Sequence, residues 1–258
     1  MKIKVCSFNL RTSWGDKGTV NDFNHRKARI ETVLRTEDPD LIGFQEVDDE
    51  IRSWLKSTLC DVYEFAGCGR EKNYRGECAL IAYRKDRFEA LETKTFWLSS
   101  QPNVPGSTYG IDQSGCPRVT TAAHLKCQDS TQPFWFYNTH LDHVGKMARL
   151  FGAMQILQDI SIHSDSDPFV LTGDFNAYPD APEIKLLQEF RGKTVEATRF
   201  LTGTFHGYEK ETPQKIDYIF TDFPCDPTQS YLIKPENING TYISDHCPVF
   251  AYLDLSAE

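Results

Sequence analysis

Alternating and continuous apolar stretches recur along the whole chain and predict a series of β-strands. In the first of them, Ile3, Val5 and Ser7 alternate with Cys6 and Phe8. The other predicted strands span residues 41–46, 62–66, 78–83, 88–96, 119–126 and 134–140, a run that ends at residue 172, and residues 216–220 and 248–253.

Apolar residues at helical spacing occupy intervals between these strands. A helix over residues 24–35 is expected to end at Asp38-Pro39, because the residue before a proline disfavours helical backbone. A short helix is expected near residues 182–190. A further helix carries Ile51, Trp54, Leu55 and Leu59 on one face. The longest carries Met147, Leu150, Phe151, Met154 and Leu157, a stripe that we expect to pack into the core.

The mixture of strands and helices predicts a layered α/β fold in which helices cover two sheets. No repeat, low-complexity tract or linker interrupts the sequence, so residues 1–258 are expected to form a single domain. The one long irregular segment, residues 101–116, is rich in Gly, Pro and Ser. Long loops inside compact domains often carry function, and we expect this one to border a binding cleft.

Composition narrows the class of protein. The chain has 258 residues, 40% hydrophobic and 25% charged, as in a globular protein with one large core. A net charge of −9 argues against salt-sensitive binding of duplex nucleic acid over a broad surface. It is compatible with a locally basic cleft, or with an acidic site that surrounds a cation.

The sequence favours a cytoplasmic location. The first strand leaves no room for a signal peptide, and no apolar run approaches the length of a membrane span. The eight cysteines lack CxxC spacing. Cys6, Cys78 and Cys247 lie in or beside apolar strands, where reduced, buried thiols are common.

Polar residues gather where predicted strands end. The run from Phe169 to Thr172 is followed by Gly173, Asp174, Phe175 and Asn176. Such a segment can form an ordinary Asp/Asn turn, or it can present an acid and an amide to one site. Similar fragments occur at other strand ends: Ser7-Phe8-Asn9, Phe44-Gln45-Glu46, Asn138-Thr139-His140, Lys215-Ile216-Asp217 and Ser244-Asp245-His246.

The residue types in these fragments favour a hard cation and a water nucleophile. Glu46 can be a surface acid or a ligand for Mg²⁺ or Mn²⁺, and Asn9 can form a turn or add an amide oxygen. The sequence contains no HExxH, zinc-type cysteine spacing, P-loop or GxSxG motif.

Two histidines, His140 and His246, end predicted strands and can each be structural or catalytic. Asp217 is expected to pair with His246, because an unpaired acid in a β-rich segment is unfavourable. If the chain is extended there, Asp245 points away from His246 and has a different role. Asp142 is expected to cap the helix that follows it.

In their order along the chain, these fragments resemble the endonuclease/exonuclease/phosphatase superfamily, from about residue 3 to residue 253. The resemblance implies a four-layer α/β sandwich with two central mixed β-sheets flanked by helices. It also implies Mg²⁺-dependent (or Mn²⁺-dependent) attack of water on phosphorus at one edge of the sheets.

The resemblance also implies roles for individual residues. Glu46 would be the principal metal carboxylate, with Asn9 and Asp245 near the metal. Asp174 would orient or deprotonate the water, and Asn176 would hold a phosphate oxygen. His246, supported by Asp217, would contact the scissile phosphate. His140 would donate to the phosphate or the leaving oxygen, with Glu77 as its carboxylate partner.

Within the superfamily, the chain looks like bacterial relatives of the deadenylase and nocturnin-like branch. The similarity lies in Phe96-Trp97-Leu98-Ser99, the loop after it, Arg118 and the run from Asn138 to His143. Those relatives often carry Trp-Asp where this chain has Ile111-Asp112. Arg118 can be a phosphate clamp or a surface residue that precedes a strand.

These observations predict a metal-dependent phosphoester hydrolase. The branch favours a phosphodiesterase of the exonuclease type that acts on single-stranded RNA or another short nucleic acid. The acidic balance favours a short or small substrate over long duplex DNA, and the alternative is a phosphatase acting on a small phosphorylated metabolite or inositol phosphate. A non-catalytic binding protein of the same fold is a third hypothesis, which the intact set of acids, amide and histidines argues against. The sequence indicates neither an obligate protein partner nor an oligomeric state.

Overall fold

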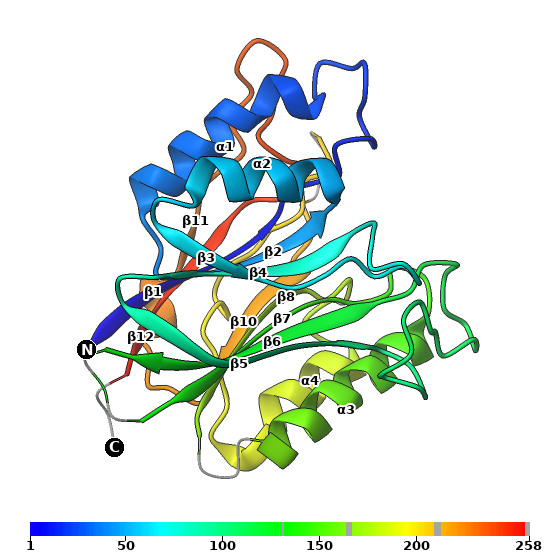
Figure 1. Ribbon diagram of the computed structural model, residues 1–258, viewed down its shortest axis with the longest axis vertical. Helices are drawn as coiled ribbons and strands as arrows, with labels where there is room; N and C mark the ends of the chain where they lie inside the picture. The colour runs from blue at the N-terminus through cyan, green and yellow to red at the C-terminus, as the bar shows by residue number, and fades with distance from the viewer. Residues whose placement is uncertain (129, 131, 164–166, 209–212, 256–258) are drawn as a thin grey trace.

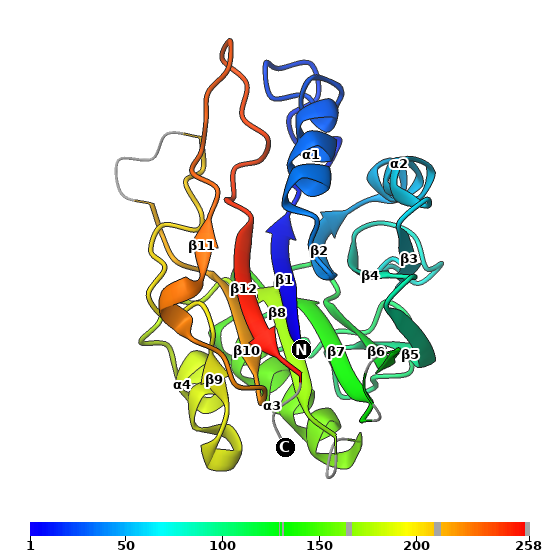
Figure 2. The ribbon, with the colours of Figure 1, turned by 90° about the vertical axis from the view of Figure 1, so that its left-hand side faces the viewer.

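The structure is a computed structural model that describes residues 1–128, 130, 132–163, 167–208 and 213–255. Two six-stranded sheets lie face to face, and two helices cover the outer side of each sheet (Figures 1 and 2). The expected four-layer α/β sandwich is confirmed.

The first sheet has the strand order β11-β12-β1-β2-β4-β3. Its central strands β1 (Lys2–Asn9) and β2 (Leu41–Val47) are parallel. The remaining strands are antiparallel to their neighbours: β3 (Tyr63–Ala66), β4 (Cys78–Arg84), β11 (Tyr231–Leu232) and β12 (Val249–Asp254). Helices α1 (Phe23–Glu37) and α2 (Asp49–Leu59) cover its outer face.

The second sheet has the order β5-β6-β7-β8-β10-β9. Here β7 (Phe134–His140) and β8 (Phe169–Asp174) are parallel. The other strands are β5 (Phe88–Trp97), β6 (Val119–Cys127), β9 (Val195–Glu196) and β10 (Asp217–Thr221). Helices α3 (Lys146–His163) and α4 (Pro182–Glu189) cover this sheet. Short 3₁₀ turns span Phe190–Gly192 and Pro227–Gln229.

Three buried apolar clusters separate the four layers. The cluster between the sheets includes Ile81, Phe136 and Ile219. A second cluster packs Phe44 and other residues of the first sheet against α1 and α2, and a third packs Leu171 and its neighbours against α3 and α4. Burial of these faces is the main source of stability of the sandwich.

The expected core stripe of α3 is confirmed only in part, because Leu157 is buried and the two methionines are not. Met147 and Met154 are 42% and 50% exposed, whereas Ala153, Ile156 and Ile160 are fully buried. The helix carries apolar residues on more than one side. Apolar residue type alone therefore did not distinguish the buried side of the helix from its exposed side.

A polar network ties the sheets together beneath the site. Gln45 Nε2 donates to Asn138 Oδ1 at 2.7 Å, and Asn138 Nδ2 donates to backbone carbonyls of β2 and β4. Thr172 Oγ1 donates to Asn138 Oδ1 at 3.1 Å. The sheets approach each other closely at Gly43, where an added Cβ would lie 2.0 Å from Thr172 Oγ1.

Among the described residues, none of the helices combines the length and apolar character needed to cross a membrane. All eight cysteines are free thiols.

Candidate active site

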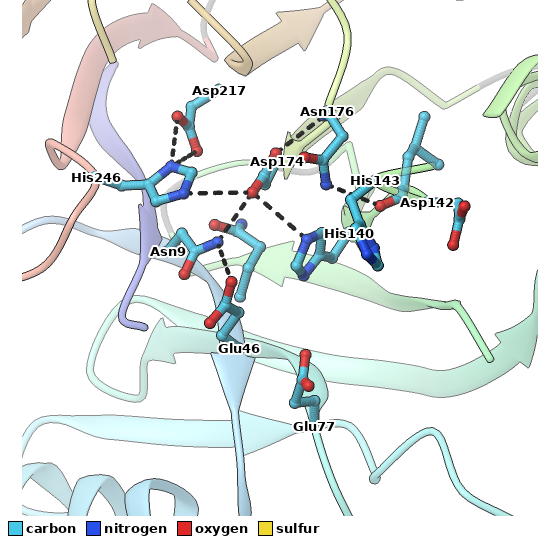
Figure 3. Close-up of polar contacts among 12 residues, drawn as sticks. Asn9, Glu46, Glu77, His140, Asp142, His143, Asp174, Asn176, Asp217 and His246 are labelled. Atoms are coloured by element: carbon cyan, nitrogen blue, oxygen red, sulfur yellow. Dashed lines mark hydrogen bonds and ion pairs between the residues drawn. The ribbon is translucent and has the colours of Figure 1, made fainter. Parts of the chain in front are cut away.

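Strand register brings three predicted site residues side by side. His140 of β7 is paired with Asp174 of β8, and Asp174 is paired with Asp217 of β10. Directly paired residues of adjacent strands present their side chains to the same face. The three side chains therefore meet at one edge of the second sheet (Figure 3).

Asp174 lies at the centre of the site. Its Oδ2 accepts a hydrogen bond from Asn9 Nδ2 at 2.9 Å and lies 3.5 Å from His140 Nε2 and 3.7 Å from His246 Nε2. Burial raises the pKa of Asp174 to about 7, against the opposing effect of the His246 imidazolium. A carboxylate with that pKa is suited to accept a proton from water near neutral pH.

Asn176 belongs to a turn and also reaches the site. Its backbone N–H donates to Asp174 Oδ1 at 3.0 Å, and its φ of 48° is left-handed. Its Nδ2 donates to the Leu141 carbonyl at 3.1 Å. The two alternatives for this segment are compatible, because the Asp/Asn turn itself places the carboxylate of Asp174 and the amide of Asn176 at the site.

His246 is held by Asp217, as expected. Its Nδ1 lies 2.9 Å from Asp217 Oδ2, and both side chains are buried. Burial alone would lower the pKa of His246, but the carboxylates of Asp217 and Asp174 raise it to about 10. The ring is therefore a cation at neutral pH.

The expectation that Asp245 and His246 point to opposite faces of a strand is wrong. The chain bends at residue 245 and enters β12 only at Val249, so both side chains line one cleft.

Glu46 lies in a β-bulge rather than at a regular strand end. The pairing of β2 with β4 shifts between Phe44 and Val47, and Glu46 takes a left-handed φ of 57°. Its Oε1 accepts from Asn9 Nδ2 at 3.2 Å and its Oε2 from the Thr12 N–H at 3.1 Å. Asn9 thus joins the carboxylates of the two sheets through one amide (Figure 3).

The acids at this edge fit a hard divalent cation. Asp245 and Glu46 both line the cleft, and burial together with the charge of Glu46 raises the pKa of Asp245. Two mutually repelling carboxylates with an oxygen-rich surround are the donors that Mg²⁺ and Mn²⁺ prefer. Asp174, Asp217 and His246 also cluster closely enough to bind a metal. His246 is hydrogen-bonded to Asp217 and its Nε2 lies 3.7 Å from Asp174, so this trio is engaged internally, whereas Glu46 and Asp245 could hold a metal.

Glu77 does not partner His140 in this structure. Its carboxylate receives two hydrogen bonds from Arg70, at 2.6 and 2.8 Å, and His140 Nε2 instead lies 3.5 Å from Asp174 Oδ2. Burial and the nearby Arg118 and Arg70 lower the pKa of His140 well below its ordinary value. Sequence reasoning missed Arg70, because nothing in the local pattern links it to a residue seven positions away.

Arg118 is not a surface residue. It is 4% exposed, lines the cleft, and contacts His143 Nδ1 through Nη2 at 2.8 Å.

The expected capping of α3 is shared between two acids. Asp142 Oδ1 accepts from the N–H groups of Val144 and Gly145 just before the helix. The first-turn N–H groups of Met147 and Ala148 instead donate to Asp112, at 2.9 Å each. The acid of the Ile111-Asp112 pair therefore fixes the long loop to the start of α3.

These side chains line a cleft of about 480 Å³. It contains Glu46, His140, Asp174, Asn176, Asp245 and His246. Arg70, Glu77, Arg118 and His143 line it as well, with Arg11, Trp14 and Phe205 among the remaining wall residues. Cys116 is the residue of the loop 101–116 that reaches this wall.

A profile of the Endonuclease/Exonuclease/phosphatase family matches residues 6–246, so the chain belongs to this family. Members of the family are phosphoester hydrolases that depend on divalent metals.

Solved structures of the same fold agree with this assignment. An endonuclease/exonuclease/phosphatase of Bacteroides vulgatus is 29% identical, with 99% of this chain and 100% of that chain covered and a TM-score of 0.87. A mannosyl-6-phosphatase of Bacteroides thetaiotaomicron is 29% identical, with 96% and 98% covered and a TM-score of 0.80. The human nocturnin catalytic domain is 18% identical, with 98% and 94% covered and a TM-score of 0.75, and shares the fold. The chain spans 60% and 49% of the length of two curated relatives that are 24% and 25% identical to it.

Proposed function

We propose that the protein is a divalent-metal-dependent hydrolase that cleaves a phosphoester of a small phosphorylated compound by attack of water. The observation that carries this proposal is the placement of Asp174. Its carboxylate, with a pKa of about 7, lies between two imidazoles and is held by the Asn9 amide. A general base and phosphate-binding groups thus share one cleft.

The proposed roles follow from the charge state of each group. Asp174 accepts the proton of the attacking water. His246, with a pKa of about 10, is already protonated and cannot be the base, so it donates Nε2–H to a phosphoryl oxygen. His140 is neutral and donates an N–H to the leaving oxygen. The second amide hydrogen of Asn176 is available to a phosphate oxygen.

Glu46 and Asp245 would hold Mg²⁺ or Mn²⁺, with Asn9 beside them. When bound, the cation offsets the negative charge that develops on the phosphoryl and leaving oxygens. In this structure Asn9 joins Glu46 to Asp174, so we infer that it positions both acids. Its part as a direct ligand remains a prediction.

A small substrate is supported by three observations. The cleft of about 480 Å³ suits one compact molecule. The net charge of −9 disfavours long polyanions. The mannosyl-6-phosphatase shares 29% identity over 96% of this chain. A hexose phosphate is therefore the first substrate class to test.

A short single-stranded RNA is the second candidate. Trp14 is 64% exposed and lines the cleft, where it offers a surface on which a base can stack. This candidate corresponds to a phosphodiesterase that removes nucleotides from an RNA end.

The test is a substrate panel with Mg²⁺, Mn²⁺ or EDTA: mannose 6-phosphate, glucose 6-phosphate, bis(p-nitrophenyl) phosphate and an end-labelled RNA decamer. We expect metal-dependent phosphate release from a hexose phosphate, and a loss of about 10²–10⁴-fold in turnover for Asp174→Asn. Cleavage of the RNA alone would favour the second candidate. Turnover of no substrate, with tight binding of one, would favour a binding protein.

A further inference from the structure

The guanidinium of Arg118 has hydrogen-bonding capacity that the protein does not use. Arg118 is 4% exposed, and neither its Nε nor its Nη1 has a hydrogen-bond partner among the described residues. Leaving buried N–H groups of a cation unpaired is costly. An acceptor from outside the chain would remove that cost.

Arg70 adds a third unused donor on the same wall. Its two terminal nitrogens are committed to Glu77, and its Nε, 3.9 Å from Glu71 Oε1, has no hydrogen-bond partner among the described residues. The backbone carbonyl of Arg70 accepts from Trp97 Nε1 at 2.6 Å, which fixes the segment. Arg70 and Arg118 also line a small hollow of about 10 Å³ that adjoins the cleft. Three donor nitrogens of two buried guanidiniums therefore lack a hydrogen-bond partner on one wall of the cleft.

Asp142, the acid beside Arg118, does not accept a hydrogen bond from the unpaired N–H groups of Arg118. Asp142 Oδ2 lies 3.5 Å from Arg118 Nε, outside hydrogen-bond geometry. The carboxylate of Asp142 instead accepts from Ser114 N, Ser114 Oγ, Val144 N and Gly145 N. Although burial opposes it, the bonds from Gly145 and Ser114 lower the pKa of Asp142 to about 2. The carboxylate oxygens of Asp142 therefore accept hydrogen bonds from Ser114, Val144 and Gly145 rather than from Arg118.

In the small hollow this wall adjoins His140 and Glu46 and does not include His246 or Asp174. Figure 3 shows His143, the partner of Arg118, on the opposite side of His140 from His246. His246, Asp174 and Arg118 all line the same cleft, and Arg118 lies on the side of His143.

We propose that Arg118, with Arg70 and His143, forms a subsite for a second phosphate group of the substrate. The inference rests on the proposed phosphoester hydrolysis and specifies its substrate class as compounds with two phosphate groups. A phosphate presents three terminal oxygens to three unused donors, whereas a carboxylate presents two. Guanidinium binds such oxygens in a fixed, forked geometry.

The test compares three compounds on one hexose skeleton: glucose 1,6-bisphosphate, glucose 6-phosphate and 6-phosphogluconate. We expect kcat/KM for the bisphosphate to exceed that for the monophosphate at least about tenfold. In Arg118→Lys, which keeps the charge and loses the fork, that ratio should fall about tenfold or more, mainly through KM. Arg75→Gln is the control, since the Arg75 side chain is 73% exposed and lies outside the cleft wall.

His143→Ala gives a second variant at an exposed position and should also lower the ratio, in case replacement of the buried Arg118 impairs folding. Equal kcat/KM values for the three compounds would overturn the subsite and leave phosphoester hydrolysis intact. A preference for 6-phosphogluconate over the bisphosphate would overturn the assignment to phosphate. No turnover of any of them, or of the substrates named above, would instead overturn the proposed function.

Discussion

Asp217 Oδ2 accepts a hydrogen bond from His246 Nδ1 at 2.9 Å, and Asp217 is paired across β10 and β8 with Asp174. One carboxylate thereby fixes the orientation and the charge of the imidazole that faces Asp174, the proposed base. The register of two strands, rather than their proximity in sequence, creates this relationship.

The first prediction concerns this pair. His246→Ala should lower kcat by about 10²–10⁴-fold, and Asp217→Ala should reproduce much of that loss, because the ring loses its positive charge and its orientation. If the two act as a unit, the double variant should be scarcely slower than His246→Ala. Steady-state kinetics of the three variants measures this, and additive losses would contradict the pairing.

A pH profile of kcat provides the second prediction. Asp174, with a pKa of about 7, must be unprotonated to act, so activity should fall as the pH drops below 7. His246 must stay protonated, so activity should fall as the pH rises through about 10. A bound cation adds positive charge and moves the acidic limb only to lower pH.

In Asp217→Asn the alkaline limb should move to lower pH, because that carboxylate raises the pKa of His246. Asp61→Asn, at an exposed site, serves as the control. An unshifted alkaline limb in Asp217→Asn would show that another group sets it.

Removal of the metal provides the third prediction. EDTA should abolish turnover, and Glu46→Gln should raise the Mg²⁺ concentration needed for half-maximal activity at least about tenfold, because it removes a charged oxygen donor. Glu64→Gln, at an exposed acid of β3, should leave that concentration unchanged. Full activity in chelator would refute the metal assignment.

The fourth prediction tests the contact between the sheets. Gly43→Ala would place a Cβ 2.0 Å from Thr172 Oγ1 and 2.5 Å from Asn138 Oδ1, within the polar network. We expect the free energy of unfolding to fall by about 1–3 kcal/mol, as overpacked sites do. Gly115→Ala, where an added Cβ meets nothing within 4 Å, is the matched control in chemical denaturation.

Period-2 patterns predicted most of the strands to within one or two residues, because each sheet buries at least one face. They missed β9 (Val195–Glu196) and β11 (Tyr231–Leu232), which are two-residue strands at the sheet edges. Such strands are too short for a period to be visible.

The sequence predicted those residues of the candidate site that lie at the ends of strands. His140, Asp174 and Asp217 could be found because polar groups interrupt apolar runs. The ion pair of Arg70 with Glu77 could not, since it depends on how the segment between β3 and β4 folds back. The bend at Asp245 likewise depends on tertiary contacts, including the hydrogen bonds that its carbonyl accepts from the N–H groups of residues 206 and 207.

The bulge at Glu46 places the needs of folding and of catalysis in opposition. A non-glycine residue with a φ of 57° costs about 1–3 kcal/mol. Glycine relieves that cost but removes the carboxylate. A laboratory selection for thermal stability that does not also score turnover would therefore favour Glu46→Gly, and its survivors would be well-folded proteins without activity.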